Sequence, residues 1–341
     1  MKKLFSSIVI SIFSLVGMPL FAHENILPEN KPFHVEVTPS GKYIYKIPDA
    51  LDTENWMIFL TIKNNESESL KLKNITFNIY SSDRKISSLI KNYNIDIVPE
   101  FSKIIPMIFF RENRDLDASL MELNISTNKG TEKIDVHLKR YQQPVKVFLP
   151  LKGVWHIGSA HEFGITHRRW DNKAQFAYDF IKIDGNGNLY TGNPDKLEDY
   201  FAFGQSVFAP GTCTVLEIHD GESDNPIGKT SKNANFVNLD LGNGVTCTLA
   251  HFKKNSIIVK EGQKLEIGDK IAEVGNSGRS DNPHLHIHIQ EYGTNSKNTL
   301  KPSFPLPLSF SDYYVHPPYL KEWEFINMGN PNSGDFVKSA K

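Results

Sequence analysis

Three histidines at every second position, His284, His286 and His288, most constrain what this chain can form. Leucine and isoleucine fill the gaps, so residues 284–289 alternate between imidazole and apolar side chains. This alternation predicts a half-buried β-strand, with the apolar side chains in a core and all three imidazoles on the opposite face. Alternate side chains on one face lie about 7 Å apart, so neighbouring imidazoles can share one small site without binding the same ion. The pattern indicates a metal site with a catalytic base beside it; the alternative is a solvated strand face that carries histidine.

Composition limits the class of protein and its partners. With 341 residues, the chain is long enough for two domains and a sizeable core. A hydrophobic content of 39% and 19 prolines are typical of a globular, strand-rich protein rather than a disordered one. The formal net charge of −1 gives no electrostatic reason to expect a nucleic-acid or anionic-membrane partner.

The N-terminus has the features of a secretory signal peptide. Basic residues at positions 2 and 3 precede an apolar stretch, Leu4–Met18, and small residues follow up to Ala22. Serines dilute the apolar stretch. This favours a signal peptide that spans residues 1–22 and is cleaved after Ala22, and a permanent membrane anchor is the alternative. No later segment is apolar enough to span a bilayer. We therefore expect an exported protein, periplasmic or secreted, with no stable membrane insertion after cleavage.

Residues 31–147 show short alternating strands separated by Asn, Gly, Ser and Pro. Two of them, Trp56–Lys63 and Leu70–Tyr80, alternate well enough to be strands of a β-sandwich-like domain, whereas only Ile95–Val98 is predicted as a strand in the polar stretch that follows. No catalytic cluster occurs in this region. We expect an accessory domain that positions the rest of the chain or binds a regulatory partner.

A second region, residues 148–316, begins after Gln142-Gln143-Pro144 and has its own strands and hairpin turns, such as Gly242-Asn243-Gly244. Hardly any stretch has a helical period, so the predicted fold class is all-β. Residues 317–341 are rich in Pro, Asn and Gly and are predicted to form an irregular C-terminal tail.

Cys213 and Cys247 are the two cysteines of the chain, and both fall in predicted strands. An exported compartment permits a disulfide between them, and two small buried thiols are the alternative.

The histidines around the second domain do not fit the zincin signature, because Ile165 stands where the second histidine after His161 would be needed. A catalytic zinc needs three protein ligands and one open position for water. With His286 as one candidate, His167 and Asp179 supply an imidazole and a carboxylate from elsewhere in the chain. His251 lies at the end of another predicted strand.

These pieces occur in an order that resembles the zinc metallopeptidases of family M23, the LytM/lysostaphin-type peptidoglycan endopeptidases. The matching segments are His167…Asp179, Gln205–Pro210, Leu249–Phe252, the Gly262–Gly268 turn, Val274–Gly278 and Pro283–His286. The resemblance implies an M23-type antiparallel β core with a metal-binding groove. It also implies one zinc ion held by His167, Asp179 and His286, with His251 and His284 as the catalytic histidines.

Two departures from the family pattern concern the metal site. Eleven residues separate His167 from Asp179, where the family more often has them four apart, and His161 is the substitute ligand. His288 replaces what is often an acidic residue, so it either tunes His286 or faces solvent.

The function that follows is an exported zinc endopeptidase that hydrolyses peptide cross-links of peptidoglycan with a metal-activated water. Which of His251 and His284 acts as general base stays open. The alternatives are a catalytically silent M23-like protein that binds the wall or activates a hydrolase, and a secreted protease that acts on proteins.

Overall fold

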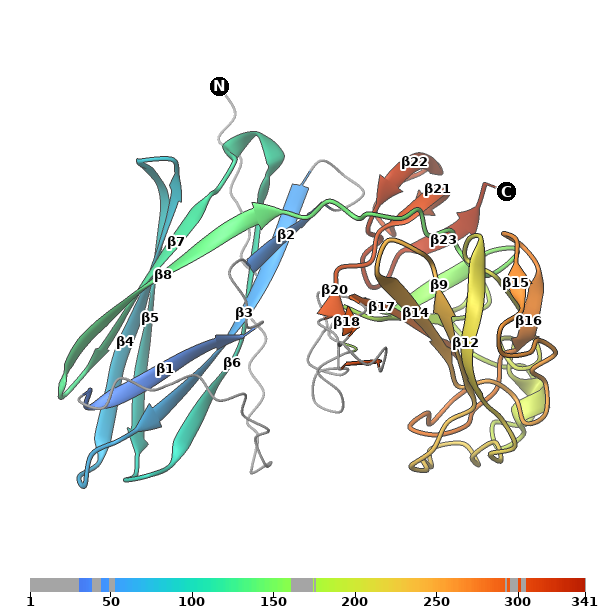
Figure 1. Ribbon diagram of the computed structural model, residues 1–341, viewed down its shortest axis with the longest axis horizontal. Helices are drawn as coiled ribbons and strands as arrows, with labels where there is room; N and C mark the ends of the chain where they lie inside the picture. Colours follow the sequence, from blue (N-terminus) through green and yellow to red (C-terminus); the bar gives the residue numbers. More distant parts are fainter. Residues whose placement is uncertain are drawn as a thin grey trace. The chain divides into compact units, whose positions relative to one another are not determined.

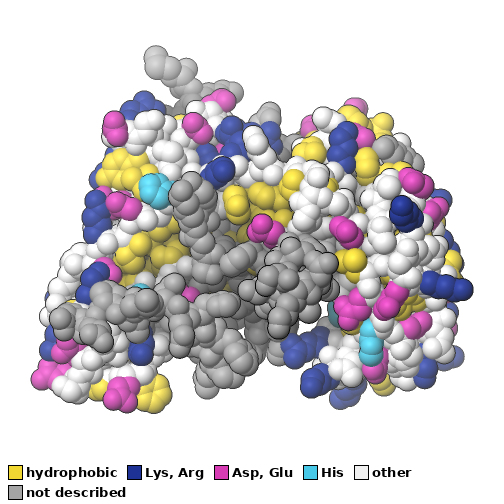
Figure 2. Space-filling model, in the orientation of Figure 1, with side chains coloured by type: hydrophobic (Ala, Val, Ile, Leu, Met, Phe, Trp, Pro, Cys, Tyr) yellow, Lys and Arg dark blue, Asp and Glu magenta, His cyan; other side chains and the backbone are white. Residues whose placement is uncertain are grey.

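The computed structural model describes residues 31–38, 44–48, 53–160, 174, 176–291, 293–294, 300–301 and 305–340. The chain divides into two compact units, Met1–Tyr141 and Gln142–Lys341, each built from strands (Figure 1). The predicted all-β fold class is confirmed. Basic and acidic side chains are interspersed among the described residues on the face shown in Figure 2, in keeping with the small net charge.

The first unit holds eight strands among its described residues, in two layers. The strand β3 pairs with β1 and β6, while β5, β4, β7 and β8 follow one another in the second layer, and β2 pairs with both β3 and β8. Their bounds are β1 (Phe33–Thr38), β2 (Ile44–Pro48), β3 (Thr53–Asn64), β4 (Leu70–Ser81), β5 (Arg84–Ile97), β6 (Ser102–Asn113), β7 (Leu120–Thr127) and β8 (Gly130–Arg140).

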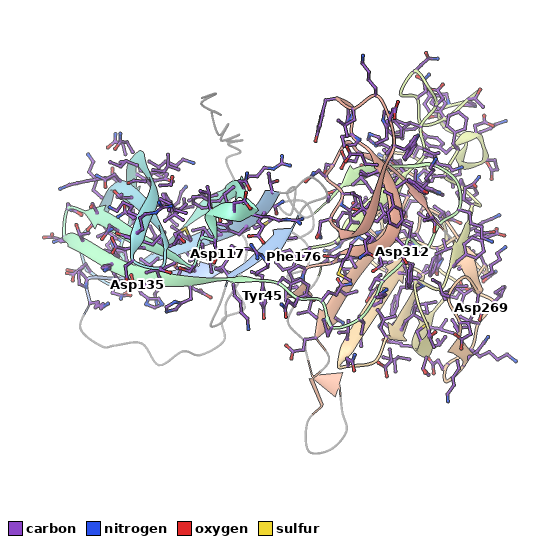
Figure 3. All side chains as sticks on the ribbon, turned by 90° about the horizontal axis from the view of Figure 1, so that it is seen from above. Tyr45, Asp117, Asp135, Phe176, Asp269 and Asp312 are labelled. Carbon is purple, nitrogen blue, oxygen red and sulfur yellow. The ribbon has the colours of Figure 1, made fainter. Side chains whose placement is uncertain are left out.

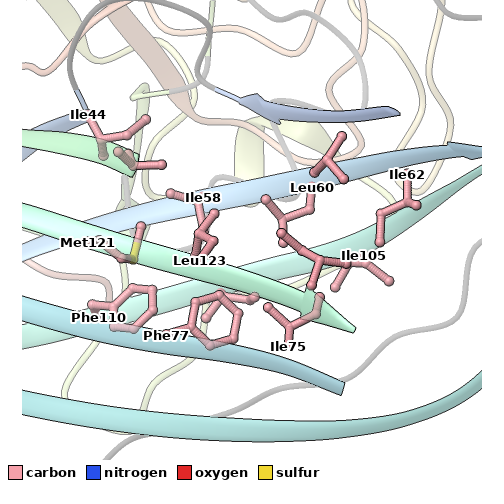
Figure 4. Packing of buried hydrophobic residues seen from close by; sticks show 14 of the residues in the cluster. Ile44, Ile58, Leu60, Ile62, Ile75, Phe77, Ile105, Phe110, Met121 and Leu123 are labelled. Carbon is pink, nitrogen blue, oxygen red and sulfur yellow. The ribbon is translucent and has the colours of Figure 1, made fainter. Parts of the chain in front are cut away.

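The core of this unit lies between the two layers. Strand β7 alternates strictly between partly exposed and buried positions, which places Met121 and Leu123 on its inner face. Figure 4 shows them packed with Ile58 of β3, Phe77 of β4 and other apolar side chains. Side chains from both layers therefore form one core, as a β-sandwich requires.

Strand β5 is much longer than the sequence indicated. It runs over Arg84–Ile97, whereas only Ile95–Val98 was predicted. Within the described residues it pairs with β4 alone, and Ile90 is 62% exposed. Because β5 is an edge strand with polar residues at many positions, its sequence lacks the clear alternation from which a strand is recognised.

Most strands of the second unit belong to one sheet with the order β15-β12-β13-β14-β17-β10-β9-β23-β21-β22, and β20 pairs with β17. Their bounds are β9 (Trp155–Ser159), β10 (Tyr178–Ile181), β12 (Cys213–His219), β13 (Phe236–Asp240), β14 (Val245–Ala250), β15 (Lys264–Leu265), β17 (Leu285–Glu291), β20 (Pro305–Leu306), β21 (Phe310–His316), β22 (Glu324–Gly329) and β23 (Phe336–Ser339). Two small ribbons pair β11 (Ser206–Phe208) with β16 (Lys270–Glu273) and β18 (Gly293–Thr294) with β19 (Leu300–Lys301).

The histidine-rich strand predicted from the alternation is β17, and its apolar residues Leu285 and Ile287 are fully buried. The prediction of a half-buried strand is wrong, because His286 and His288 are each only 8% exposed. Other parts of the chain cover the histidine face as well.

The predicted irregular tail differs from the structure. Among the described residues after 316, two stretches form the strands β22 and β23, and β23 joins β21 to β9 in the large sheet. Backbone pairing with distant strands, rather than local composition, determines the conformation of this segment.

Cys213 and Cys247 are buried, free thiols, so the alternative without a disulfide is the one found. Burial raises the pKa of Cys213 to about 12 and also raises that of Cys247. Within the described residues no helix has the length and apolarity to cross a bilayer, and the predicted signal peptide lies outside those residues.

Candidate active site

Adjacent strands bring Asp179 and His286 together. In the antiparallel pair β10·β17 these two residues are direct partners, so their side chains lie on the same face of the sheet. The distance from His286 Nδ1 to Asp179 Oδ1 is 3.0 Å. The flanking Tyr178 and Phe180 are fully buried and pack on Phe310 on the other face. The aromatic anchor on one face thus fixes the carboxylate on the other.

His284 reaches the same carboxylate from just before β17. Its Nε2 lies 3.6 Å from Asp179 Oδ1. Its Nδ1 lies 2.9 Å from the carbonyl oxygen of Asn282 and 3.1 Å from Ser280 Oγ. Since a carbonyl oxygen can only accept, Nδ1 carries the proton and Nε2 presents a lone pair towards the site.

His251 follows β14 and has a left-handed backbone, with φ of 68°. Its Nδ1 donates a hydrogen bond of 2.7 Å to the carbonyl oxygen of Ser277, which leaves Nε2 without the proton. Its ring centroid lies 4.7 Å from that of His284 and 5.6 Å from that of His286. Burial, together with these two neighbouring imidazoles, holds the pKa of His251 well below its ordinary value. In both His251 and His284, Nδ1 therefore donates to a carbonyl oxygen, and Nε2 is the nitrogen left to accept a proton.

His288 supports His286 from the side away from Asp179. Its Nδ1 lies 3.0 Å from His286 Nε2. The expectation that His288 contacts His286 agrees with this geometry, and the solvent-facing alternative is wrong. If His286 carries its proton on Nε2 and donates it to His288 Nδ1, then His286 Nδ1 is unprotonated and directed at Asp179.

A buried polar network behind the two catalytic candidates was missed by the sequence analysis. Ser280 Oγ lies 2.6 Å from Asn276 Oδ1, and Ser277 Oγ accepts from the backbone N–H of Asn235 at 3.0 Å. All four of these residues are at most 1% exposed. A sequence signal was present in the Val274–Gly278 segment, which the sequence analysis uses only as one of the segments that resemble the family. The network fixes the loop carbonyl and hydroxyl groups that orient His251 and His284.

Gly275 lies closer to neighbouring backbone atoms than a residue with a side chain could. A Cβ at this position would overlap the backbone N and Cα of Lys253 and lie 2.5 Å from Asp224 Oδ1. Its N–H also donates to the carbonyl oxygen of His251 at 3.0 Å. Gly275→Ala should therefore lower the free energy of unfolding by about 1–3 kcal/mol, as overpacking of a tight site does, when measured by urea denaturation.

The matched control for that substitution is Gly185→Ala, because a Cβ at Gly185 would meet nothing within 4 Å and its φ is ordinary. Equal unfolding free energies for the two variants would contradict the close packing described for Gly275.

Of the predicted metal ligands, the structure brings Asp179 and His286 into contact, while His167 and its substitute His161 lie outside the described residues. Among the described residues, no group of three or more His, Cys, Asp or Glu side chains is arranged to hold a metal ion. The two donors present, one carboxylate and one imidazole nitrogen, are of the types that zinc takes in proteins, so they fit part of a zinc site.

Part of this unit is similar to known proteins. Residues 197–298 match peptidase family M23. A curated relative, the peptidoglycan DD-endopeptidase ShyA of Vibrio cholerae, is 36% identical over 75 residues, which cover 22% of this chain and 17% of that protein.

Two solved structures are also similar. One is a zinc-containing peptidase from Vibrio cholerae, with 14% identity and a TM-score of 0.25 over 74% of this chain and 57% of that one. The other is Csd3 of Helicobacter pylori, with 11% identity and a TM-score of 0.25 over 72% of this chain and 66% of that one. His251, His284 and His286 lie within the matched range, whereas Asp179 precedes it. The resemblance read from the sequence motifs is thus confirmed, since residues 197–298 match peptidase family M23.

Proposed function

We propose that this protein is an exported, zinc-dependent endopeptidase that hydrolyses the peptide cross-links of peptidoglycan. The observation that carries the proposal is the pairing of Asp179 with His286 beside two further imidazoles, those of His251 and His284. The match of residues 197–298 to a peptidase family and the name of the Vibrio relative, a peptidoglycan endopeptidase, support the reaction and the substrate.

Asp179, His286 and His167 would hold the zinc ion, with His161 as the alternative to His167. Zinc bound there would polarise the scissile carbonyl and lower the pKa of a water molecule towards 7. The remaining chemistry falls to the chain itself. His251 and His284 each present an unprotonated Nε2, so either can accept the proton of the attacking water. The imidazolium so formed can then stabilise the developing oxyanion or protonate the leaving amine.

Location and partners are part of the same proposal. The basic start, the apolar stretch and Ala22 support export to the periplasm or the exterior, where peptidoglycan is found. The first unit would position the peptidase or bind a regulatory partner.

Digestion of purified sacculi by the mature, zinc-loaded protein tests the proposal. New free amines from sacculi, with little release from an unfolded protein such as casein, are the expected result. Release from casein alone would favour a secreted protease. Zinc binding without release from either substrate would contradict the proposed activity.

His288→Phe should lower the affinity for zinc about 10–100-fold, the usual effect of removing a group that orients a metal ligand. Phenylalanine fills a similar space but cannot accept the hydrogen bond of His286 Nε2, which is 3.0 Å from His288 Nδ1. Competition with a chromophoric chelator measures the affinity.

His288→Gln keeps an acceptor in place and should recover part of the affinity that His288→Phe loses. If His288→Phe bound zinc as tightly as wild type, His288 would not orient His286.

A further inference from the structure

Aromatic side chains gather on the last strands of the large sheet, β21 and β22. Tyr314 and Phe325 are direct strand partners, 36% and 54% exposed, with ring centroids 5.5 Å apart. Trp323 lies beside His316 at 5.4 Å. Lys338 of β23 places its Nζ 5.2 Å from the Tyr314 ring and 4.4 Å from the Trp323 ring. These five residues are called the aromatic platform.

The strand register places the platform on the same face of the sheet as Asp179. Asp179 and Ile181 are two residues apart on β10, and Ile181 is the partner of His156 on β9. His156 is in turn the partner of Phe336 on β23, and Phe336 that of His316 on β21. Because direct partners and alternate residues share a face, the sequence of pairs leads from Asp179 to His316 without changing sides.

The opposite face of the same strands is the core. Phe310 of β21 packs on Phe180 of β10, with ring centroids 5.6 Å apart, and Tyr313 and Val315 are fully buried. Tyr314 alternates with Tyr313 and Val315 and lies on the platform side. Asp312, which Figure 3 labels, has a left-handed backbone with φ of 49°, and it interrupts the alternation between Phe310 and Tyr313, so both of these residues face the core. The exposed aromatic rings are therefore not an extension of the core but a separate surface.

Three strand spacings separate β10 from β21, in the order β10-β9-β23-β21. At about 4.8 Å per spacing, Tyr314 lies roughly 15 Å across the sheet from the strand that carries Asp179. A polymer whose cleavable branch enters the site could thus contact the platform with its main chain. The platform lies outside residues 197–298, the part of the chain that matches the peptidase family.

We infer that the aromatic platform binds the glycan chain of peptidoglycan, and this inference rests on the proposed function. Aromatic faces stack on the C–H faces of pyranose rings, while His316 and Lys338 offer hydrogen-bond donors to hydroxyl and acetamido groups.

A protein partner fits this surface less well. The apolar centre that a stable protein interface needs is interrupted here by the cationic Lys338 and flanked by the exposed acids Glu322 and Glu324. The continuity of the platform with the face that carries Asp179 also favours the polymer to which the cleaved peptide is attached.

The test uses the full mature chain and glycan chains freed of their stem peptides by an amidase. Tyr314→Ala/Phe325→Ala should raise the Kd for this glycan at least about tenfold. The ratio of activity on sacculi to activity on a sugar-free cross-linked peptide should fall as well. Phe101→Ala removes an aromatic side chain that is 66% exposed in the first unit, and it should match wild type in both measurements.

Wild-type protein that does not retain the glycan, or a double variant that binds it as tightly as wild type, would overturn the inference. Specific retention of a cell-envelope protein instead of glycan would do the same. Because the probe carries no peptide, glycan binding without peptide cleavage contradicts only the proposed function, and cleavage without glycan binding contradicts only the platform.

Discussion

His284→Ala is expected to retain zinc at the wild-type level while kcat falls about 10²–10⁴-fold, the usual contribution of a positioned acid or base. The Nδ1 of His284 is held by the Asn282 carbonyl oxygen at 2.9 Å, and its Nε2 lies 3.6 Å from Asp179 Oδ1. The side chain is thus oriented to exchange a proton next to the proposed ligands. Its loss removes one of the two groups that can accept or donate a proton in the reaction, but neither of the two proposed zinc ligands in contact, Asp179 and His286.

The measurement combines metal analysis with sacculus digestion. His219→Ala is the control, since His219 is a histidine of the same unit, 43% exposed, that contacts Glu222 rather than the site. It should leave both zinc content and turnover unchanged. If His284→Ala lost zinc and turnover in parallel, His284 would be a metal ligand instead of a base.

His286→Ala is expected to lose the zinc ion itself. His286 is the direct strand partner of Asp179, and its imidazole lies 3.0 Å from Asp179 Oδ1. The substitution removes this imidazole, so only the carboxylate of the pair would be left to bind zinc. Loss of a residue that only orients a metal ligand lowers metal affinity about 10–100-fold. Loss of a ligand itself should lower the affinity by a larger factor. Asp179→Asn, which keeps the shape but not the charge, should act in the same direction.

A stability measurement checks this without any reference to activity. Zinc at 100 times its Kd should stabilise the wild-type protein by about 2.7 kcal/mol, and this increment should be absent in His286→Ala. His219→Ala should keep the full increment. The same zinc-dependent shift in wild type and His286→Ala would exclude His286 as a ligand.

The strand at residues 285–291 could be predicted from sequence because its cause is local. Alternation of leucine or isoleucine with histidine fixes which side chains share a face, wherever the strand lies in the sheet. The alternation did not reveal that His286 and His288 are both buried, since burial of the second face depends on segments that are distant in the chain.

Strands without a local signal were not predicted. β5 has polar residues at many positions, and β22 and β23 follow a segment rich in proline and asparagine. Each of them is defined by the backbone of its neighbours: β5 by β4, and β23 by β9 and β21. Pairing between distant segments cannot be read from composition, because the same residues form loops where no partner strand is available.

The site shows the same division between local pattern and tertiary structure. Motif resemblance singled out Asp179, His251, His284 and His286, and their order in the chain was enough to identify the family. The contact between Asp179 and His286 joins residues 107 positions apart, and only the pairing of β10 with β17 creates it. The left-handed backbone of His251 and the carbonyl oxygens that fix the two catalytic candidates likewise arise from the folded loop.

By itself, the sequence therefore determined the all-β class, the histidine strand and the set of chemically suitable side chains. Periodicity and residue type are properties of short segments, and they are already present in the unfolded chain. The tertiary structure alone decided which imidazole nitrogens face the carboxylate and that the face carrying Asp179 continues into the aromatic platform. Both depend on the register between strands, which is set when the side chains of the whole sheet pack together.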